Sequence, residues 1–186
     1  MVFACDGAHS ATRSALSSVV AADQDYLEHG YKELTIPARD GEFAIDPGAL
    51  HIWGREGSMM IALPNVDRSF TCTLFWPRSG PGSFDSLSSA EQVRHHFRQH
   101  YPDVVDLMPT LVDDYQHNPV GSLVTVRAWP WTAAGERCRV ALVGDAAHAI
   151  VPFYGQGANC AFEDTVEIDR LLGLHGPDWD RVLAAY

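Results

Sequence analysis

The feature that most constrains the fold is a run rich in small residues that follows a short apolar segment. Residues 139–143 read as a buried strand that ends at Gly144-Asp145. A loop of small residues over 146–157 comes next, and the pattern then predicts a helix from about 158 to 172, ended by Gly173 and Gly176. A strand, a glycine loop and a helix in this order are typical of an α/β fold, in which ligands bind at the carboxyl edge of the strands.

The residue types in this run suit a flat ligand that carries hydroxyl and phosphate groups. Asp145 can accept hydrogen bonds from sugar or polyol hydroxyls, and Gly155 and Gly157 let the backbone approach a ring closely. The free N–H groups near Ala158 and Asn159 and the positive end of the helix dipole suit a pyrophosphate or a negatively charged ring. A bare Gly-Asp pair is more often a simple turn, but the whole run with its spacing favours a ligand site.

The rest of the chain divides into α/β-like ends and a β-rich middle. An apolar run over 2–5 leads into Asp6-Gly7, and 10–20 reads as a short helix. β-branched and aromatic residues then predict an antiparallel sheet from strands at 31–36, 49–53, 58–63 and 69–75, with a hairpin turn at 64–67.

Further elements follow the predicted sheet. Ser88 and Glu91 have the spacing of a capping box, which predicts a helix over about 90–101. Another strand is expected at 124–128, and a last amphipathic helix begins at Asp178.

Two motifs together carry a family resemblance. The run from Gly144 to Asp164 resembles the second flavin motif of the class A flavoprotein monooxygenases, and residues 5–13, CDGAHSATR, resemble their DGxxSxxR motif. The resemblance implies that Asp145 meets the ribityl and phosphate region of FAD, and that the backbone at 158–159 faces the isoalloxazine. It ties the first motif to FAD and NADPH binding. The implied cofactor-binding residues are Asp6, Arg13, Asp145, Gly157, Ala158 and Asn159.

The resemblance also implies an architecture. The expected fold is α/β (α+β): a partial FAD/NAD(P)-binding Rossmann-like domain with an inserted antiparallel substrate-binding sheet. Residues 1–28 would form part of the FAD-binding domain, 29–128 the substrate-binding sheet with its helix, and 129–186 the continuation of the FAD-binding domain. The family's N-terminal GxGxxG unit is absent from the sequence, and both ends look like cuts through a longer protein.

The middle of the chain distinguishes the branches of that family better than the two motifs do. The segments HGYKELTIP at 29–37, LHIW at 50–53, MIALPN at 60–65 and FTCTLF at 70–75 resemble the kynurenine 3-monooxygenase branch of that family. The residues that this implies for the substrate pocket are Leu50, Ile61, Leu63, Thr73, Phe75, Pro152, Phe153 and Tyr154. The alternation of strands supports the set, since Ile61 and Leu63 share one face, as do Thr73 and Phe75; an ordinary sheet core is the other interpretation.

The implied activity is hydroxylation of L-kynurenine to 3-hydroxykynurenine with FAD and NADPH. The flavin would carry the oxygen chemistry, so no catalytic acid, base or nucleophile of the chain is nominated. Two alternatives stay open. The 186 residues are a non-catalytic fragment as they stand, or the enzyme hydroxylates another aromatic acid or a phenol.

The composition disfavours several classes of partner and site. The net charge of −11 disfavours a nucleic-acid partner. The four cysteines lie far apart, without a CxxC pair, so free buried thiols are expected and neither zinc nor disulfides. No apolar run reaches the roughly 20 residues of a membrane helix, and the N-terminus does not read as a signal peptide, so a cytoplasmic protein is the default.

Three further signals in the sequence do not indicate a metal site or a catalytic residue. His96 and His100 lie one helical turn apart, but without an HExxH pattern a solvated helix face is favoured over a metal site. His148 reads as structural, and Ser10 lacks the Gly-x-Ser-x-Gly elbow of a hydrolase.

Overall fold

The structure is a computed structural model that describes residues 1–135 and 138–186. The chain forms two compact units. Unit 1 comprises Met1–Tyr26 and Leu123–Tyr186, and unit 2 comprises Leu27–Ser122. The boundaries predicted after residues 28 and 128 lie a few residues from these limits, and the assignment of functions to the domains stays a prediction.

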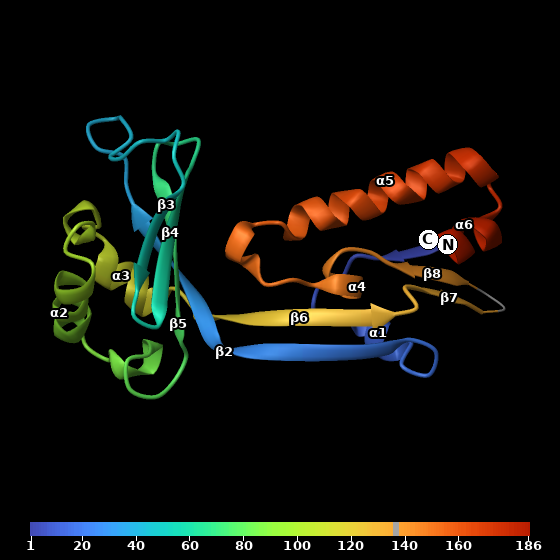
Figure 1. The fold of residues 1–186 in the computed structure, drawn as a ribbon, viewed down its shortest axis with the longest axis horizontal. Coiled ribbons are helices and arrows are strands. Elements are labelled where there is room, and N and C mark those ends of the chain that lie inside the picture. Colours follow the sequence, from blue (N-terminus) through green and yellow to red (C-terminus); the bar gives the residue numbers. More distant parts are fainter. Residues whose placement is uncertain (136–137) are drawn as a thin grey trace. The chain divides into compact units, whose positions relative to one another are not determined.

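Unit 1 contains a small sheet with strands in the order β1-β8-β7 (Figure 1). β1 (Val2–Ala4) pairs in parallel with β8 (Arg139–Leu142), which pairs antiparallel with β7 (Thr132–Ala134). The parallel pair joins the first strand to a segment more than 130 residues later, and Val2 lies opposite Val140. The helices of this unit are α1 (Ala11–Ala15), α4 (Asp145–His148), α5 (Gly157–His175) and α6 (Trp179–Ala185), with a 3-10 turn η3 (Pro152–Tyr154) before α5.

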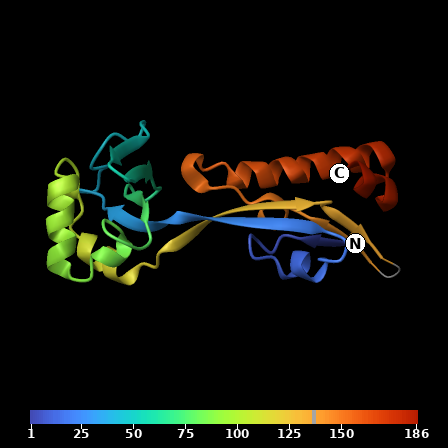
Figure 2. The ribbon, with the colours of Figure 1, turned by 60° about the horizontal axis from the view of Figure 1, so that its bottom comes forward.

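Unit 2 is built on an antiparallel sheet. The strand order is β3-β4-β5-β2-β6, and β2 and β6 begin or end in unit 1. Both appear as long ribbons in Figure 2, β2 in blue and β6 in yellow. Two helices, α2 (Ala90–His100) and α3 (Leu111–His117), cover one face of the sheet, with 3-10 turns η1 (Phe84–Ser86) and η2 (Val105–Leu107) (Figure 1). The strands are β2 (Ala21–Ile36), β3 (His51–Arg55), β4 (Ser58–Pro64), β5 (Phe70–Pro77) and β6 (Gly121–Trp129). The predicted α/β class is confirmed.

The register of the sheet separates its two faces. Cys72 lies opposite both Leu34 and Ala62, and all three side chains are buried in the cluster that α2 and α3 complete. Because successive side chains point to opposite faces, the residues between them form the other face. We call this second face, which lies opposite the helices, the open face of unit 2.

Several local predictions are corrected. The capping box of α2 consists of Ser89 and Gln92, not Ser88 and Glu91, because the Gln92 carboxamide accepts from the backbone N–H groups of both Ser88 and Ser89. The helix α5 runs through Gly173 to His175, and Gly176 follows as its C-cap with a positive φ of 60°, which glycine adopts easily.

Other elements differ in length or were missed. The helix α1 has 5 residues, shorter than the predicted 10–20, while β2 has 16 and starts well before residue 31. The helix α3 was not predicted, and α4 occupies part of the predicted loop.

The structure also bears on the predictions made for the cysteines and for membrane helices. All four cysteines are free, but only Cys72 is buried; Cys5 and Cys138 are exposed and Cys160 is half-buried, so the prediction of buried thiols is wrong for these. Within the described residues, no helix has the length and apolar character needed to cross a membrane.

Candidate cofactor site

The turn that follows β8 has a conformation only glycine adopts easily. Gly144 has φ of 61° and ψ of −138°, and a Cβ built on it would lie 3.0 Å from the Cβ of Ala161 on α5. The strand therefore passes close under α5 and turns sharply. Asp145 follows as the first residue of α4 and its side chain is exposed, whereas Ala146 and Ala147 are buried.

A buried carboxylate on α5 holds this turn from one side. Asp164 is 7% exposed, and its Oδ2 accepts a hydrogen bond of 2.6 Å from the backbone N–H of Gly144. The same oxygen lies 2.8 Å from Nε2 of His148. The ring of His148 also packs against Trp131, with centroids 4.9 Å apart. These contacts agree with the structural role predicted for His148.

An arginine from the first motif holds the turn from the other side. Arg13 is 4% exposed, and its guanidinium donates to the carbonyl oxygens of Ala146 at 2.7 Å and Ala8 at 2.6 Å. One planar cation thus joins two motifs that are more than 130 residues apart in the sequence. Any effect of Arg13 on a cofactor is therefore expected to act through the position of these loops.

The carboxylate of Asp6 is used within its own loop. It accepts from Ser10 Oγ at 2.5 Å, from the backbone N–H of Thr12 at 3.0 Å and from Thr12 Oγ1 at 2.9 Å. Burial alone would raise the pKa of Asp6, but these hydrogen bonds outweigh it and lower the pKa to about 2. Asp6 therefore stabilises the entry into α1, and it does not line the pocket described next.

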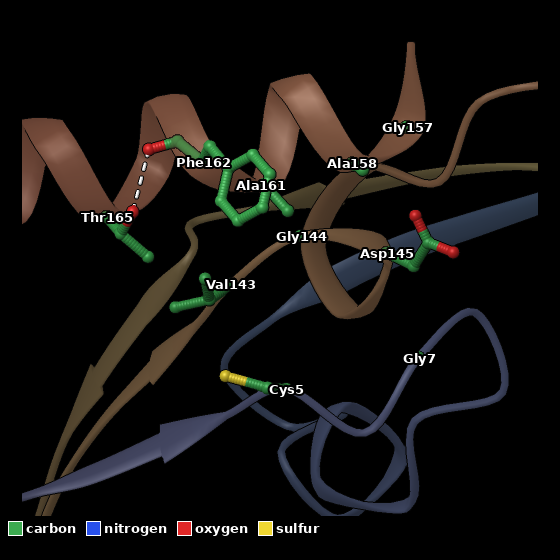
Figure 3. A pocket seen from close by; sticks show the side chains of 10 residues that line it. All are labelled: Cys5, Gly7, Val143, Gly144, Asp145, Gly157, Ala158, Ala161, Phe162 and Thr165. Carbon is green, nitrogen blue, oxygen red and sulfur yellow. Dashed lines mark hydrogen bonds between the residues drawn. The ribbon is translucent and has the colours of Figure 1, made fainter. Parts of the chain in front are cut away.

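A pocket of about 470 Å³ opens between the two motifs and the start of α5 (Figure 3). Figure 3 shows Asp145 between the Gly7 loop and the Gly157 end of α5, with Phe162 farther along the helix. Of the predicted cofactor residues, Asp145, Gly157 and Ala158 line it, while Asp6, Arg13 and Asn159 do not. The full lining is Cys5, Gly7, Val143, Gly144, Asp145, Gly157, Ala158, Ala161, Phe162 and Thr165.

Part of this lining was missed, although the sequence holds a signal for it. Ala158, Ala161, Phe162 and Thr165 have the i, i+3, i+4, i+7 spacing that places side chains on one side of a helix. Phe162 is 66% exposed on this side of the helix. Once Ala158 was assigned to the site, this spacing could have extended the prediction along α5.

The pocket's chemistry fits FAD. The carboxylate of Asp145 has no hydrogen-bond or ion-pair partner in the described part of the chain, so it is available to ligand hydroxyls. No side chain among the described residues caps the N-terminus of α5, which leaves its first N–H groups for an anion or a ring oxygen. A Cβ on Gly157 would lie 3.9 Å from Asp145 Oδ1, so the carboxylate lies close to the start of α5.

The predicted substrate residues fall in both units. In unit 2, Ile61 lies opposite Thr73 in the register of β4 and β5, and both lie on the open face. Phe75 shares this face and is 3% exposed, whereas Leu63 is 49% and Leu50 is 55% exposed. Pro152, Phe153 and Tyr154 form η3 in unit 1. Their joint action in one substrate pocket stays a prediction.

The histidine pair on α2 has no metal-ligand surroundings. His96 packs against Trp76 with ring centroids 4.5 Å apart and lies 4.4 Å from the ring of His100. Burial first, then the neighbouring charges of His100 and His95, lower the pKa of His96 to about 4. No group of three or more metal-binding side chains occurs in the part of the chain that the structure describes. The helix face that carries His96 is half-buried, however, not fully solvated as predicted.

The comparison with protein families shows the family of the chain. Residues 1–177 match the family described as FAD binding domain. The chain belongs to the FAD-binding-domain family. The predicted FAD cofactor is thereby confirmed, and the placement of FAD in the pocket around Asp145 stays a prediction.

Relatives of known name cover almost the whole chain. The kynurenine 3-monooxygenase of Dictyostelium discoideum is 55% identical over 170 residues, which are 90% of this chain and 36% of that protein. The kynurenine 3-monooxygenase of Flavobacterium psychrophilum is 48% identical over 189 residues, 100% of this chain and 42% of that protein. The chain therefore spans about two fifths of the length of these relatives.

Solved structures agree on the fold. A tetrameric form of 2-methyl-3-hydroxypyridine-5-carboxylic acid oxygenase matches with a TM-score of 0.74 at 22% identity, covering 100% of this chain and 48% of that one. HpxO of Klebsiella pneumoniae complexed with FAD and uric acid matches with a TM-score of 0.71 at 20% identity, covering 100% of this chain and 46% of that one. At these identities the likeness concerns the fold alone.

Proposed function

We propose that this chain supplies the flavin-facing loops and the substrate-facing sheet of an FAD- and NADPH-dependent monooxygenase that hydroxylates L-kynurenine to 3-hydroxykynurenine. The observation that carries the proposal is the identity of 48% over the entire chain with a kynurenine 3-monooxygenase. The two motif loops, joined by Arg13 around the pocket of Asp145, support it.

The chain's own residues would bind, orient and exclude water. Asp145 would accept hydrogen bonds from the ribityl hydroxyls, and the uncapped start of α5 would face the electron-rich end of the ring system. Ile61, Thr73 and Phe75 on the open face of unit 2 would hold the aromatic ring of the substrate. Bound FAD supplies the oxygen chemistry, with electrons from NADPH.

The test uses a chimera in which residues 1–186 replace the matching segment of the Flavobacterium psychrophilum relative. We expect the purified chimera to contain FAD and to oxidise NADPH faster when L-kynurenine is added, with 3-hydroxykynurenine as the product. A chimera that contains FAD but responds only to another aromatic acid or a phenol would move the proposal to that substrate. FAD bound without any hydroxylation would overturn it.

A substitution in the sheet tests the substrate assignment. We expect Phe75→Ala in the chimera to raise the KM for L-kynurenine about tenfold or more, the loss expected when a buried aromatic contact of about 1.5 kcal/mol is removed. The FAD content, measured by visible absorbance, should change much less. Equal losses of FAD and kynurenine binding would show that Phe75 is an ordinary core residue.

A further inference from the structure

The open face of unit 2 carries a second, smaller pocket. Its volume is about 220 Å³, and it is lined by Tyr31, Glu33, Asn118, Pro119 and Gly121, all of them in unit 2. It lies at the edge where β2 meets the segment that enters β6. None of these residues belongs to the predicted substrate or cofactor sets.

The strand register puts this pocket on the same face as the predicted substrate residues. Glu33 lies opposite Thr73 in the pairing of β2 with β5, and Thr73 lies opposite Ile61 in the pairing of β5 with β4. Tyr31 lies opposite Phe75, with ring centroids 6.5 Å apart. Directly opposed residues of an antiparallel pair point to the same side, so the pocket adjoins the proposed ring site.

The walls of the pocket are fixed by contacts from both sides of the sheet. Lys32, which is 5% exposed, donates to the carbonyl oxygen of Tyr115 at 2.8 Å and to that of Asn118. The Asn118 side chain donates to the carbonyl oxygen of Glu33 at 2.7 Å. The segment after α3 is thus tied to β2 at two neighbouring residues.

Gly121 fixes the position of the Tyr31 ring. A Cβ on Gly121 would lie 2.3 Å from Cε1 of Tyr31, so the phenol ring rests directly on this backbone and no larger residue fits. The ring is therefore held at a fixed position beside the carboxylate of Glu33.

Two polar groups of the lining, the Glu33 carboxylate and the Asn118 amide oxygen, accept hydrogen bonds, and the Tyr31 hydroxyl can donate or accept one. The carboxylate of Glu33 makes no hydrogen bond or ion pair with any residue of the described part, and its side chain is exposed. The Asn118 amide nitrogen is already engaged, which leaves its oxygen as a second acceptor. A carboxylate beside an amide oxygen and a phenol favours a ligand that brings N–H donors and positive charge.

The geometry points to this pocket as the subsite that receives an amino group of the aromatic substrate, with Glu33 as the residue that accepts its N–H. The inference rests on the proposed function, because kynurenine carries both an arylamine and an α-ammonium group. Either group supplies the donor that the pocket requires. The experiment below separates the two.

The test compares Glu33→Gln with Glu28→Gln in the chimera. Glutamine keeps the shape of the side chain and removes its charge. Glu28 is a matched control, since it is an exposed glutamate on the same strand, and an odd separation from Glu33 places it on the opposite face. Circular dichroism and FAD content verify that both variants fold.

We expect Glu33→Gln to raise the KM and the Kd for L-kynurenine about tenfold or more, as for the loss of one charge-assisted hydrogen bond. Its FAD content should be unchanged, and Glu28→Gln should match the parent chimera. Two analogues locate the amino group: 3-benzoylalanine lacks the arylamine, and 4-(2-aminophenyl)-4-oxobutanoate lacks the α-ammonium group. The penalty of Glu33→Gln should vanish for one of them.

Three outcomes overturn the inference. A Glu33→Gln chimera that hydroxylates and binds kynurenine like the parent would refute the subsite and leave the proposed function standing. A penalty that persists with both analogues would show that Glu33 acts on something other than an amino group. A parent chimera that neither binds nor hydroxylates kynurenine would remove both proposals together.

Discussion

The two units of this protein use their buried side chains differently. Unit 2 has a large cluster rich in aromatic residues, among them Phe70, Phe97 and Tyr101, all fully buried. The cluster of unit 1 is small and is made of alanine, valine and one leucine. Its motif loops are held instead by Arg13 and Asp164, which bond to the backbone.

This contrast teaches how each site keeps its shape. In unit 2 the open face rests on a sheet whose other side is packed, so its residues are positioned by the strand register. In unit 1 the pocket is bordered by a glycine turn that a few hydrogen bonds to charged groups hold in place. We therefore expect substitutions in the buried cluster of unit 2 to lower stability, and substitutions that release the glycine turn of unit 1 to displace the cofactor site as well.

The largest effect is expected from the core of unit 2. Phe97 is 0% exposed, and Phe97→Ala should lower the free energy of unfolding by about 3–5 kcal/mol through a cavity and lost burial. Urea unfolding of the chimera measures it. A loss below 1 kcal/mol, on the order expected of an exposed position, would contradict the packed core described for this unit.

The next effect concerns the anchor of the glycine turn in unit 1. Asp164→Ala leaves the N–H of Gly144 and the ring of His148 without their acceptor, and should cost about 2–3 kcal/mol. FAD content should fall as well, because the turn carries Asp145. Asp169→Ala, at an exposed position of the same helix, is the control and should change neither quantity.

Substitution of Asp145 should weaken FAD binding and leave the stability of the fold almost unchanged. Its side chain is exposed and unpartnered in the described structure, so Asp145→Ala should alter the unfolding free energy by less than about 0.5 kcal/mol. The Kd for FAD should nevertheless rise about tenfold or more, as expected for lost charge-assisted hydrogen bonds. Unchanged FAD affinity in reconstitution of the apoprotein would place the cofactor elsewhere.

The smallest effect is a pH dependence at Asp6. Its folded-state pKa of about 2 lies below the ordinary value of 3.8, so its contribution to stability is complete above pH 3.8 and is lost as the pH falls toward 2. Because the carboxylate is exposed, solvent screening limits this contribution to less than about 1 kcal/mol. Unfolding of Asp6→Asn and the parent should differ at pH 5 and converge near pH 2; a constant difference would exclude this titration.

Much of the fold could be predicted from local sequence. The strands β3, β4 and β5 were placed within a few residues because β-branched and aromatic residues alternate there between turn signals. The first half of β2 is polar and has no such pattern, so it was missed. The capping box was misplaced by one residue because two Ser-x-x-Glu/Gln patterns overlap at 88–92, and only the Gln92 side chain decides between them.

The sequence by itself indicated the flavin class, because the run around Gly144-Asp145 and the CDGAHSATR motif resemble the flavin motifs of a known family. Only the tertiary structure decided what the buried charges do. Arg13 and Ala146 are 133 residues apart, and no local pattern encodes which carbonyl a guanidinium will reach. The place of the Tyr31 ring was decided in the same way, since its partners Phe75 and Gly121 lie far away in the chain.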